Sequence, residues 1–473
     1  MMHPYSIRRI LGFILLQSLC WGIVQAAPSR PNVLFISIDD LNDWVGYLGG
    51  HPQVKTPHLD RLAARGVYFT HAQTAAPLCG PSRTAIFTGL APSRTGIYDN
   101  NQWFRRVPAL RETVTLPQAL RLGGYRTIAA GKLFHTSVQG GQPAAEFQET
   151  APQTWVGYGP LPEKKLNYTA DPTVQLRDWG AFPAKNEEQS DYQIANFAIG
   201  KLSQPADQPF FLGVGFFRPH VPFYVPQEWF DLYPQEKIVM PPAKADDLDD
   251  LPPSGRSKSG RSTAFDAQWV KANGKAREIV RAYLACVSFI DAQVGRVLDA
   301  LESGPHRDNT IIVLFSDHGF HLGEKEHFGK TTLWERSTRV PLILAGPGIE
   351  RNRACDRPVS LLDLYPTLVE LAGLPARQGL SGRSFARLLR NPEMKWGAPV
   401  VTTWREGNHA VRSERWRYIR YRNGDEELYD HANDPHEWTN LAADKKGAAA
   451  KGRLREWLPA VDAPTLPLAG QKK

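Results

Sequence analysis

The sequence is poor in cysteine and lacks any long run of charge, and both shortages narrow the class of protein. Its 473 residues include four cysteines, too few for a scaffold held together by disulfides. Lysine and arginine outnumber the acidic residues by only eight, so the charge does not indicate a nucleic-acid partner. With 42% hydrophobic and 22% charged residues, the chain is neither disordered nor a coiled coil. What remains is a globular protein with one large domain and a small one.

The first 26 residues predict a secretory signal peptide. A pair of arginines precedes the apolar stretch Ile10–Val24, and small residues end the segment at Ala26. A membrane anchor is the alternative, but the apolar stretch is short for a span and is flanked by charge on one side only. A lipoprotein signal built on Cys20 is disfavoured because Leu19 stands where a small residue is needed. We therefore expect a secreted or periplasmic protein without stable membrane insertion. Cleavage would remove two arginines and no acid, which lowers the formal charge from +8 to +6.

Short apolar runs rich in β-branched or aromatic residues alternate with helical patterns, which is typical of a parallel sheet covered by helices on both faces. The predicted strands are Asn32–Ile38, Arg126–Ala130, Phe210–Phe217, Ile311–Phe315 and Pro341–Ala345. The predicted helices are Pro57–Arg65 with Thr56 as its cap, Thr115–Leu122 and Glu278–Leu301. This alternation indicates the α/β fold class.

The pattern changes near residue 396. The segments Ala398–Thr403, Trp416–Tyr421 and Glu427–Tyr429 alternate in polarity and predict a small antiparallel sheet. We therefore divide the chain into a signal peptide (1–26), a large α/β domain (27–395) and a small C-terminal α+β subdomain (396–473). Within the large domain, residues 239–264 are rich in proline, glycine, serine and acid, which predicts a long surface loop.

Four of the predicted strands run directly into polar residues. In an open α/β sheet the ligand crevice lies outside the carboxyl ends of the strands, so these residues are expected to meet. In chain order they are Asp39-Asp40, Gly131-Lys132-Leu133-Phe134-His135, Arg218-Pro219-His220 and Asp317-His318-Gly319. Each group alone is common in turns and caps, but together they offer ligands for a divalent cation, contacts for an anion and proton carriers. The pattern therefore indicates a metal-assisted site for an anion.

Cys79 stands where a helix is expected to begin. It precedes Pro81, which suits the first turn of a helix, and Gly89 is expected to end that helix. The free N–H groups at a helix N-terminus favour an anion, and Arg83 lies about one turn further on. On these grounds alone Cys79 is equally well a buried cap residue or the thiol of a Cys–His enzyme, which would need no metal.

The stretch Cys79-Gly80-Pro81-Ser82-Arg83, followed by Thr88-Gly89, resembles the signature of type I sulfatases, in which the cysteine is oxidised to formylglycine. The pairs Asp39-Asp40 and Asp317-His318 stand where the metal ligands of that family stand, and residues 427–437 resemble its C-terminal strand and turn. Within the family, residues 131–135 and 218–223 are most similar to iduronate-2-sulfatases. The resemblance covers nearly the whole chain after residue 26. It implies an alkaline-phosphatase-like fold, with a large mixed sheet between helices and a small C-terminal antiparallel sheet.

The resemblance also implies a reaction and the residues that carry it. Residue 79, converted by a formylglycine-generating enzyme, would attack sulfur through its hydrated aldehyde and expel the sugar alcohol, and sulfate would then leave as the aldehyde re-forms. The implied metal ligands are Asp39, Asp40, Asp317, His318 and the modified Cys79. The other implied roles are orientation of residue 79 by Arg83, sulfate binding by Lys132 and Lys330, assistance to the gem-diol by His135, and protonation of the leaving oxygen by His220. Calcium is the expected ion, with manganese as the alternative because His318 supplies an imidazole.

The expected substrate is a sulfated saccharide, such as a polysaccharide unit or a 2-O-sulfated uronic acid. Candidate substrate contacts are Trp103, Arg105, Arg106, Trp334 and Arg405. A phosphonate or phosphodiester hydrolase of the same superfamily is the alternative enzyme. An inactive, secreted polyanion-binding protein is the alternative of another class, but it would not need a nucleophile and proton carriers together.

The remaining cysteines have simpler interpretations. Cys286 lies on the apolar face of the helix predicted over 278–301 and is expected to be a small core residue. Cys355 follows Asn352-Arg353-Ala354 in a predicted loop, and the sequence leaves its pairing open.

Overall fold

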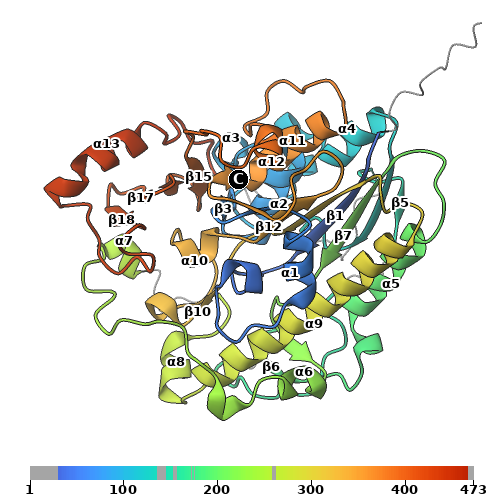
Figure 1. Cartoon of the computed structure of the whole chain (residues 1–473). Helices are drawn as coiled ribbons and strands as arrows, with labels where there is room; N and C mark the ends of the chain where they lie inside the picture. The colour runs from blue at the N-terminus through green and yellow to red at the C-terminus, as the bar shows by residue number, and fades with distance from the viewer. Residues whose placement is uncertain are drawn as a thin grey trace, which may run out of the picture.

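The computed structural model describes residues 30–135, 145–152, 157–171, 173–174, 176–257 and 263–466, so the predicted signal peptide lies outside the described residues. The centre of the structure is an eight-stranded mixed sheet (Figure 1). Its strands are β1 (Asn32–Ile38), β2 (Gly66–Phe69), β4 (Arg126–Gly131), β5 (Glu149–Thr150), β7 (Phe210–Phe216), β9 (Thr310–Ser316), β12 (Leu342–Ala345) and β13 (Arg353–Cys355). They follow one another across the sheet in the order β13-β2-β12-β9-β1-β7-β4-β5.

The middle of this sheet is parallel and fully buried. Strand β1 pairs in parallel with both β7 and β9, and β4 pairs in parallel with β7. Every residue of β1, β7 and β9 is buried, which is why these strands are continuous apolar runs rather than alternating ones. The strands predicted from those runs are confirmed to within one or two residues.

Strand β12 departs from the parallel pattern. It pairs antiparallel with both β9 and β2, so a parallel arrangement is wrong for residues 341–345. An apolar run reports burial on both faces and carries no information on strand direction. The mixed sheet implied by the family resemblance is confirmed.

Helices cover both faces of the sheet, as Figure 1 shows. One face carries α1 (Pro57–Ala63), α5 (Ser190–Leu202) and α9 (Ala276–Ser303). The other carries α2 (Cys79–Thr88), α4 (Leu116–Leu122), α11 (Leu364–Leu371) and α12 (Ala386–Arg390). Strand β1 divides the core between them, because Leu34 and Ile36 pack into one apolar cluster and Val33 and Phe35 into the other.

Shorter elements fill the periphery. They are α3 (Pro92–Thr95), α6 (Gln227–Asp231), α7 (Pro253–Arg256), α8 (Ala267–Ala272), α10 (Glu335–Thr338), β3 (Ala72–Gln73), β6 (Trp179–Ala181), β8 (Phe223–Val225), β10 (His321–Leu322), β11 (Phe328–Gly329) and β14 (Val359–Ser360). Among the residues that the structure describes, no helix is both long enough and apolar enough to cross a bilayer.

The cap predicted for α1 is wrong in its chemistry. Thr56 occupies the cap position, but its hydroxyl accepts the Gly46 N–H and contacts Asp60 instead of capping. The first N–H groups of α1 donate to the buried carboxylate of Asp291 on α9, at 2.8 Å from Leu59 and 3.2 Å from His58. A distant acid thus caps this helix, which local sequence does not reveal.

The two remaining cysteines are free and buried. Cys286 lies in the core on α9, as predicted. Cys355 ends β13, so the predicted loop is wrong at this residue: the segment pairs in parallel with β2 at the edge of the sheet.

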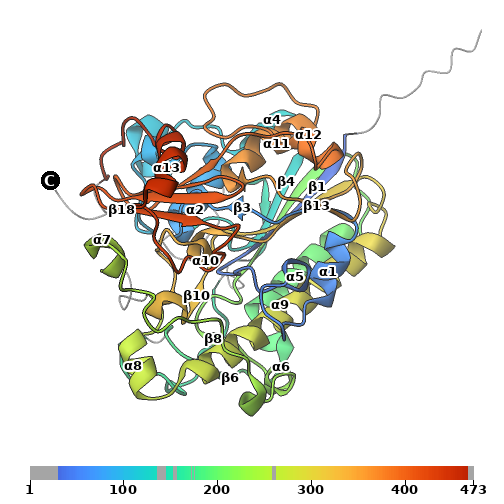
Figure 2. The ribbon, with the colours of Figure 1, turned by 60° about the vertical axis from the view of Figure 1, so that its left-hand side comes forward.

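A second, four-stranded antiparallel sheet follows near the C-terminus, as predicted (Figure 2). Its strands lie in chain order: β15 (Val400–Thr403), β16 (His409–Arg412), β17 (Trp416–Arg420) and β18 (Glu426–Asp430), with α13 (Ala448–Arg455) packed against them. The sequence missed β16 because two of its four buried residues, His409 and Arg412, are polar. The boundary near residue 396 stays a prediction.

A few residues of the segment predicted as a surface loop are buried against the C-terminal sheet. Asp247 and Leu251 are buried, and Leu251 packs with Trp334 and Tyr429. The surface-loop prediction is therefore wrong for Asp247, Leu251 and Gly255, which are buried, while most of residues 239–257 are exposed or half-buried. Residues 258–262 of that prediction lie outside the described residues.

Candidate active site

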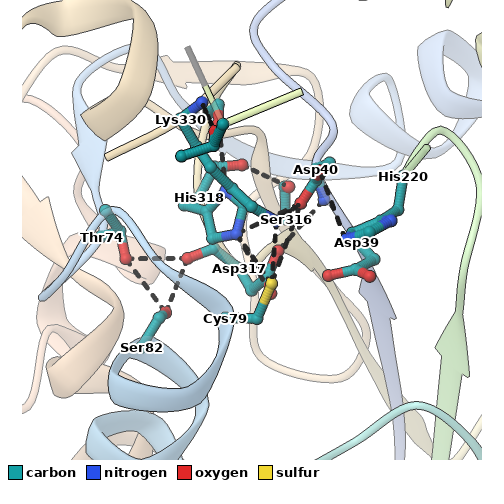
Figure 3. Close-up of polar contacts among 12 residues, drawn as sticks. Asp39, Asp40, Thr74, Cys79, Ser82, His220, Ser316, Asp317, His318 and Lys330 are labelled. Atoms are coloured by element: carbon teal, nitrogen blue, oxygen red, sulfur yellow. Dashed lines mark hydrogen bonds and ion pairs between the residues drawn. The ribbon is translucent and has the colours of Figure 1, made fainter. Parts of the chain in front are cut away.

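The four strand ends meet at one edge of the sheet. Because β9, β1, β7 and β4 are adjacent and parallel, their carboxyl ends carry the predicted polar residues to the same place. Figure 3 shows Asp39, Asp40, Asp317, His318 and His220 around Cys79.

Cys79 is the first residue of α2 and is fully buried. The helix ends at Gly89 in the left-handed conformation (φ 69°), as predicted. The sulfur of Cys79 lies 3.0 Å from Lys330 Nζ, 3.2 Å from His318 Nε2 and 4.0 Å from Asp40 Oδ1. The predicted nucleophile thus faces both cationic and carboxylate groups.

Arg83, one turn into α2, links the strand ends. Its Nε donates to Asp317 Oδ2 at 2.8 Å and its Nη2 to Asp39 Oδ1 at 3.2 Å. A third donor, Nη1, bonds the carbonyls of Lys132 and Leu133. The buried guanidinium therefore fixes α2 to the ends of β1, β4 and β9.

Two lysine ammonium groups enter the site from segments that are far apart in the sequence. Lys132 Nζ lies 2.5 Å from Asp39 Oδ2, and Lys330 Nζ lies 2.6 Å from Asp40 Oδ1. The nearby Lys325 points elsewhere: its Nζ bonds Asp247 Oδ1 at 2.8 Å and the carbonyl of Glu437. The structure thus separates two lysines that are five residues apart and similar in sequence context.

Burial and charge together perturb the titration of these groups. Burial alone would raise the pKa of the Cys79 thiol, but the charges of Lys132 and Lys330 hold it well below its usual value. Burial raises the pKa of Asp317 to about 6 despite the charge of Arg83. Burial opposes protonation of His318, yet Asp317 raises the pKa of that imidazole to about 9. The site therefore stabilises a negative charge at residue 79.

A close set of ligand atoms fits a divalent cation. One atom each from Asp39, Asp40, Cys79 and His318 lies within 4.8 Å of all the others. Asp40 Oδ2 is buried without a hydrogen-bond partner, and buried carboxylate oxygens without partners are costly unless an ion satisfies them. Asp317 borders this set, with Oδ1 accepting the Asp40 N–H and Oδ2 3.7 Å from His318 Nε2. These donors suit the predicted metal.

The two predicted proton carriers, His135 and His220, differ in their surroundings. Burial lowers the pKa of His135, which the negative charge of Cys79 opposes, and Nδ1 of His135 is buried without a hydrogen-bond partner among the described residues. His220 Nε2 lies 3.9 Å from Asp40 Oδ2, while its Nδ1 bonds the carbonyl of Val221 at 2.6 Å. Nε2 of His220 is thus the nitrogen left facing the site.

Sequence reasoning missed the residues that position the predicted ones. Tyr158 stacks on the His220 ring with centroids 4.9 Å apart, and no motif marks it. Thr74 and Ser82 both donate to the Asp317 carbonyl, at 2.8 and 2.6 Å (Figure 3). Ser82 belongs to the Cys79 motif, so the sequence could have indicated that it lies at the site. Tyr158 and Thr74 reach the site through tertiary contacts that no motif marks.

Of the five candidate substrate contacts, only Arg405 lines a pocket beside Cys79. Trp334 is buried and donates its Nε1–H to Glu427, and Arg105 pairs with Glu146. Trp103 packs against Phe134, and Arg106 is exposed without lining that pocket. The structure thus gives Trp103, Arg105 and Trp334 structural contacts.

The fold and the site define an α/β enzyme with the alkaline-phosphatase-like fold and an anion site at the carboxyl ends of the strands. The chain belongs to the sulfatase family: the family model "Sulfatase" matches residues 31–374. A second model, the C-terminal region of N-sulphoglucosamine sulphohydrolase, matches residues 323–463. The protein is accordingly a sulfuric ester hydrolase.

Individual relatives agree with the family. A sulfatase of Formosa agariphila is 43% identical over 453 residues, covering 93% of this chain and 88% of its own. The iduronate 2-sulfatase of Mus musculus is 31% identical, covering 79% of this chain and 75% of its own. Among solved structures, a 2-O GAG sulfatase superposes with a TM-score of 0.70 at 26% identity, covering 90% of this chain and 91% of its own. A phosphonate monoester hydrolase of Agrobacterium radiobacter reaches 0.72 at 24% identity over 90% and 94%, a likeness of fold alone.

Proposed function

We propose that this protein is a secreted sulfatase that removes sulfate from carbohydrate esters, using formylglycine at position 79 and a divalent metal. Calcium is the preferred ion in this proposal. The observation that carries the proposal is the surroundings of Cys79, whose sulfur lies within 3.2 Å of both Lys330 Nζ and His318 Nε2. The similarity to an iduronate 2-sulfatase and to a 2-O GAG sulfatase supports a 2-O-sulfated uronic acid or related polysaccharide unit as substrate.

A thiol at this position would form a stable thiosulfate ester, whereas a hydrated aldehyde can release sulfate. In the proposed reaction, one hydroxyl of the hydrate forms a bond to sulfur as the bond from sulfur to the sugar oxygen breaks. His220 gives its proton to that leaving oxygen, and His135 assists deprotonation of the second hydroxyl, so that sulfate leaves as the aldehyde re-forms. Proton transfer of this kind contributes about 10²–10⁴ in rate.

The remaining charged groups bind and neutralise the ester. Lys132 and Lys330 are buried ammonium groups paired with Asp39 and Asp40, and they would bind sulfate oxygens. Arg83 holds residue 79 in register with Asp39 and Asp317. A bound divalent cation would supply Lewis-acid polarisation, held by Asp39, Asp40, His318 and residue 79, with Asp317 beside them.

Mass spectrometry and rate measurements on protein from an oxidation-competent host test the proposal. The peptide containing residue 79 is expected to be about 18 Da lighter than the cysteine form. Cys79→Ala should abolish sulfate release, while Cys355→Ala, a buried thiol far from the site in sequence, is the matched control that should retain it. An unmodified Cys79 in active protein would refute the mechanism. Faster cleavage of phosphonate monoesters than of sulfate esters would favour the alternative hydrolase.

A further inference from the structure

A pocket of about 540 Å³ opens beside the nucleophile. Its lining includes Leu78, which precedes Cys79, Thr331, which follows Lys330, and His135, which itself belongs to the proposed reaction. The pocket also reaches Trp404 and Arg405, in the loop between β15 and β16 of the C-terminal sheet. A molecule with its sulfate at residue 79 would therefore extend toward those two side chains.

The C-terminal sheet is anchored to the segment that leads into α2. In β15, the Thr402 hydroxyl donates to the Thr74 carbonyl at 2.6 Å, and the Thr403 N–H donates to the Ala75 carbonyl at 2.9 Å. Figure 1 shows β15 beside β3 and close to α2. The loop that follows β15 is thus held in a fixed place relative to the nucleophile.

This loop presents Arg405 as a cation without a carboxylate partner in the part of the chain that the structure describes. Arg405 is exposed and has a left-handed backbone (φ 57°), which is uncommon for a residue other than glycine. Its guanidinium lies 5.1 Å from the centre of the Trp404 ring. The adjacent acid, Glu406, is engaged elsewhere, with Oε1 3.3 Å from Arg422 and Oε2 accepting from Thr465.

Trp404 adds a second donor. The side chain is 7% exposed and lines the same pocket, yet its Nε1–H is buried without an acceptor among the described residues. An indole N–H can only donate, and leaving it unpaired costs free energy that an acceptor on a ligand would recover. Asp99 also lines the pocket, but its Oδ1 already accepts the Asn101 N–H at 3.1 Å.

We propose that Arg405 and Trp404 form a recognition subsite for a second anionic group of the substrate, a carboxylate or a further sulfate, on the saccharide whose sulfate is cleaved. The guanidinium supplies the charge, and the indole N–H donates to the same group or to a neighbouring hydroxyl. This inference rests on the proposed function and makes it more specific, because it selects acidic saccharides over neutral ones.

The test compares Arg405→Gln with the wild-type enzyme on four probes: a monosulfated uronate disaccharide, its carboxyl-reduced counterpart, a disulfated disaccharide and an aryl sulfate. A hydrogen bond to a charged group contributes about 1.5–3 kcal/mol, so kcat/KM for the acidic disaccharides should fall about 10-fold to 100-fold more than for the aryl sulfate, mainly through KM. Trp404→Phe should give a smaller loss with the same substrate order. Arg453→Gln, which removes an exposed arginine of α13 that does not line the pocket, is the matched control.

The pattern of losses across the four probes identifies the anionic group that the subsite binds, or overturns the subsite. A loss confined to the uronate identifies a carboxylate, and a loss confined to the disulfated probe identifies a sulfate. Equal losses on acidic and carboxyl-reduced saccharides, or aryl sulfate turnover with no saccharide turnover, would overturn the subsite. If formylglycine-containing protein releases no sulfate from any of the four probes, the proposed function itself has failed.

Discussion

Replacing Lys330 with methionine removes an ammonium group from the nucleophile while keeping an unbranched side chain. In the structure Nζ of Lys330 lies 3.0 Å from the sulfur of Cys79 and the residue is buried, at 7% exposure. Two unit charges about 4 Å apart interact by about 4 kcal/mol at the effective dielectric of a protein site. Removal of one preorganised contact to a developing charge costs about 10²–10³ in kcat, or about 2.7–4 kcal/mol, which agrees with that value.

Lys325→Met provides the matched control, because Lys325 is also buried and lies in the same segment. Its ammonium group pairs with Asp247 and the carbonyl of Glu437 instead of the site. Loss of that pairing leaves a buried carboxylate without its partner and should lower the free energy of unfolding by about 3–5 kcal/mol. Turnover per folded molecule should stay at the wild-type value.

The assay is the initial rate of sulfate release from an aryl sulfate, normalised to the formylglycine content from intact mass. Denaturant unfolding of both variants supplies the free energies. Both variants should lose stability, because Lys330 pairs with the buried Asp40 and Lys325 with the buried Asp247. Only Lys330→Met should lose kcat per folded molecule. Wild-type kcat in Lys330→Met, or equal loss of turnover in both variants, would refute the assignment of Lys330 to the site.

Three further predictions concern other parts of the molecule. His220→Gln should lower turnover of sugar sulfates by about 10²–10⁴, and that of aryl sulfates with acidic leaving groups far less, which a series of leaving groups would measure. Burial raises the pKa of Asp291 from its usual value of 3.8 to about 7, so the folded state binds this proton more tightly than the unfolded state, and stability falls as the pH rises between those values. In Asp291→Asn the unfolding free energies at pH 5 and pH 7 should lose this pH dependence, which amounts to up to about 1.4 kcal/mol per pH unit. An unchanged slope of unfolding free energy against pH would contradict the prediction. Glu335→Gln takes the charge from a carboxylate paired with the buried Arg417 and should cost about 3–5 kcal/mol in denaturant unfolding, whereas Glu393→Gln, at an exposed pair, should cost less than about 1 kcal/mol.

Much of the fold follows from local pattern. The buried strands β1, β7 and β9 are continuous apolar runs, and α9 shows one apolar face over its length, so each was predicted within two residues. Strand direction was not predicted at β12, since burial on both faces looks the same in a parallel or an antiparallel strand. The cap of α1 escaped prediction because its acceptor, Asp291, lies more than 200 residues away.

The site shows the same division. Chemistry-bearing residues that follow strands could be named from the sequence, because the carboxyl ends of adjacent parallel strands must share an edge. Contacts made by side chains from unmarked segments could not, and Tyr158 against His220 is the clearest example. Among the candidate substrate contacts, the sequence did not distinguish Trp334 from Arg405. In the structure Trp334 is buried and donates to Glu427, whereas Arg405 is exposed in a loop where its own backbone is left-handed.

The sequence by itself determined the class of the protein, because the Cys79 motif and the residues after four strands carry both the family and its chemistry. Only the tertiary structure decided which of two similar lysines reaches the nucleophile and which arginine faces the pocket beside it. The physical reason is that a motif is a property of neighbours along the chain. The position of an ammonium or guanidinium group depends instead on the partners that folding brings to it. These partners are Asp40 and Cys79 for Lys330, and Asp247 for Lys325. The few cysteines, which excluded a disulfide scaffold, are free and buried in the described chain, and one of them stands at the centre of the site.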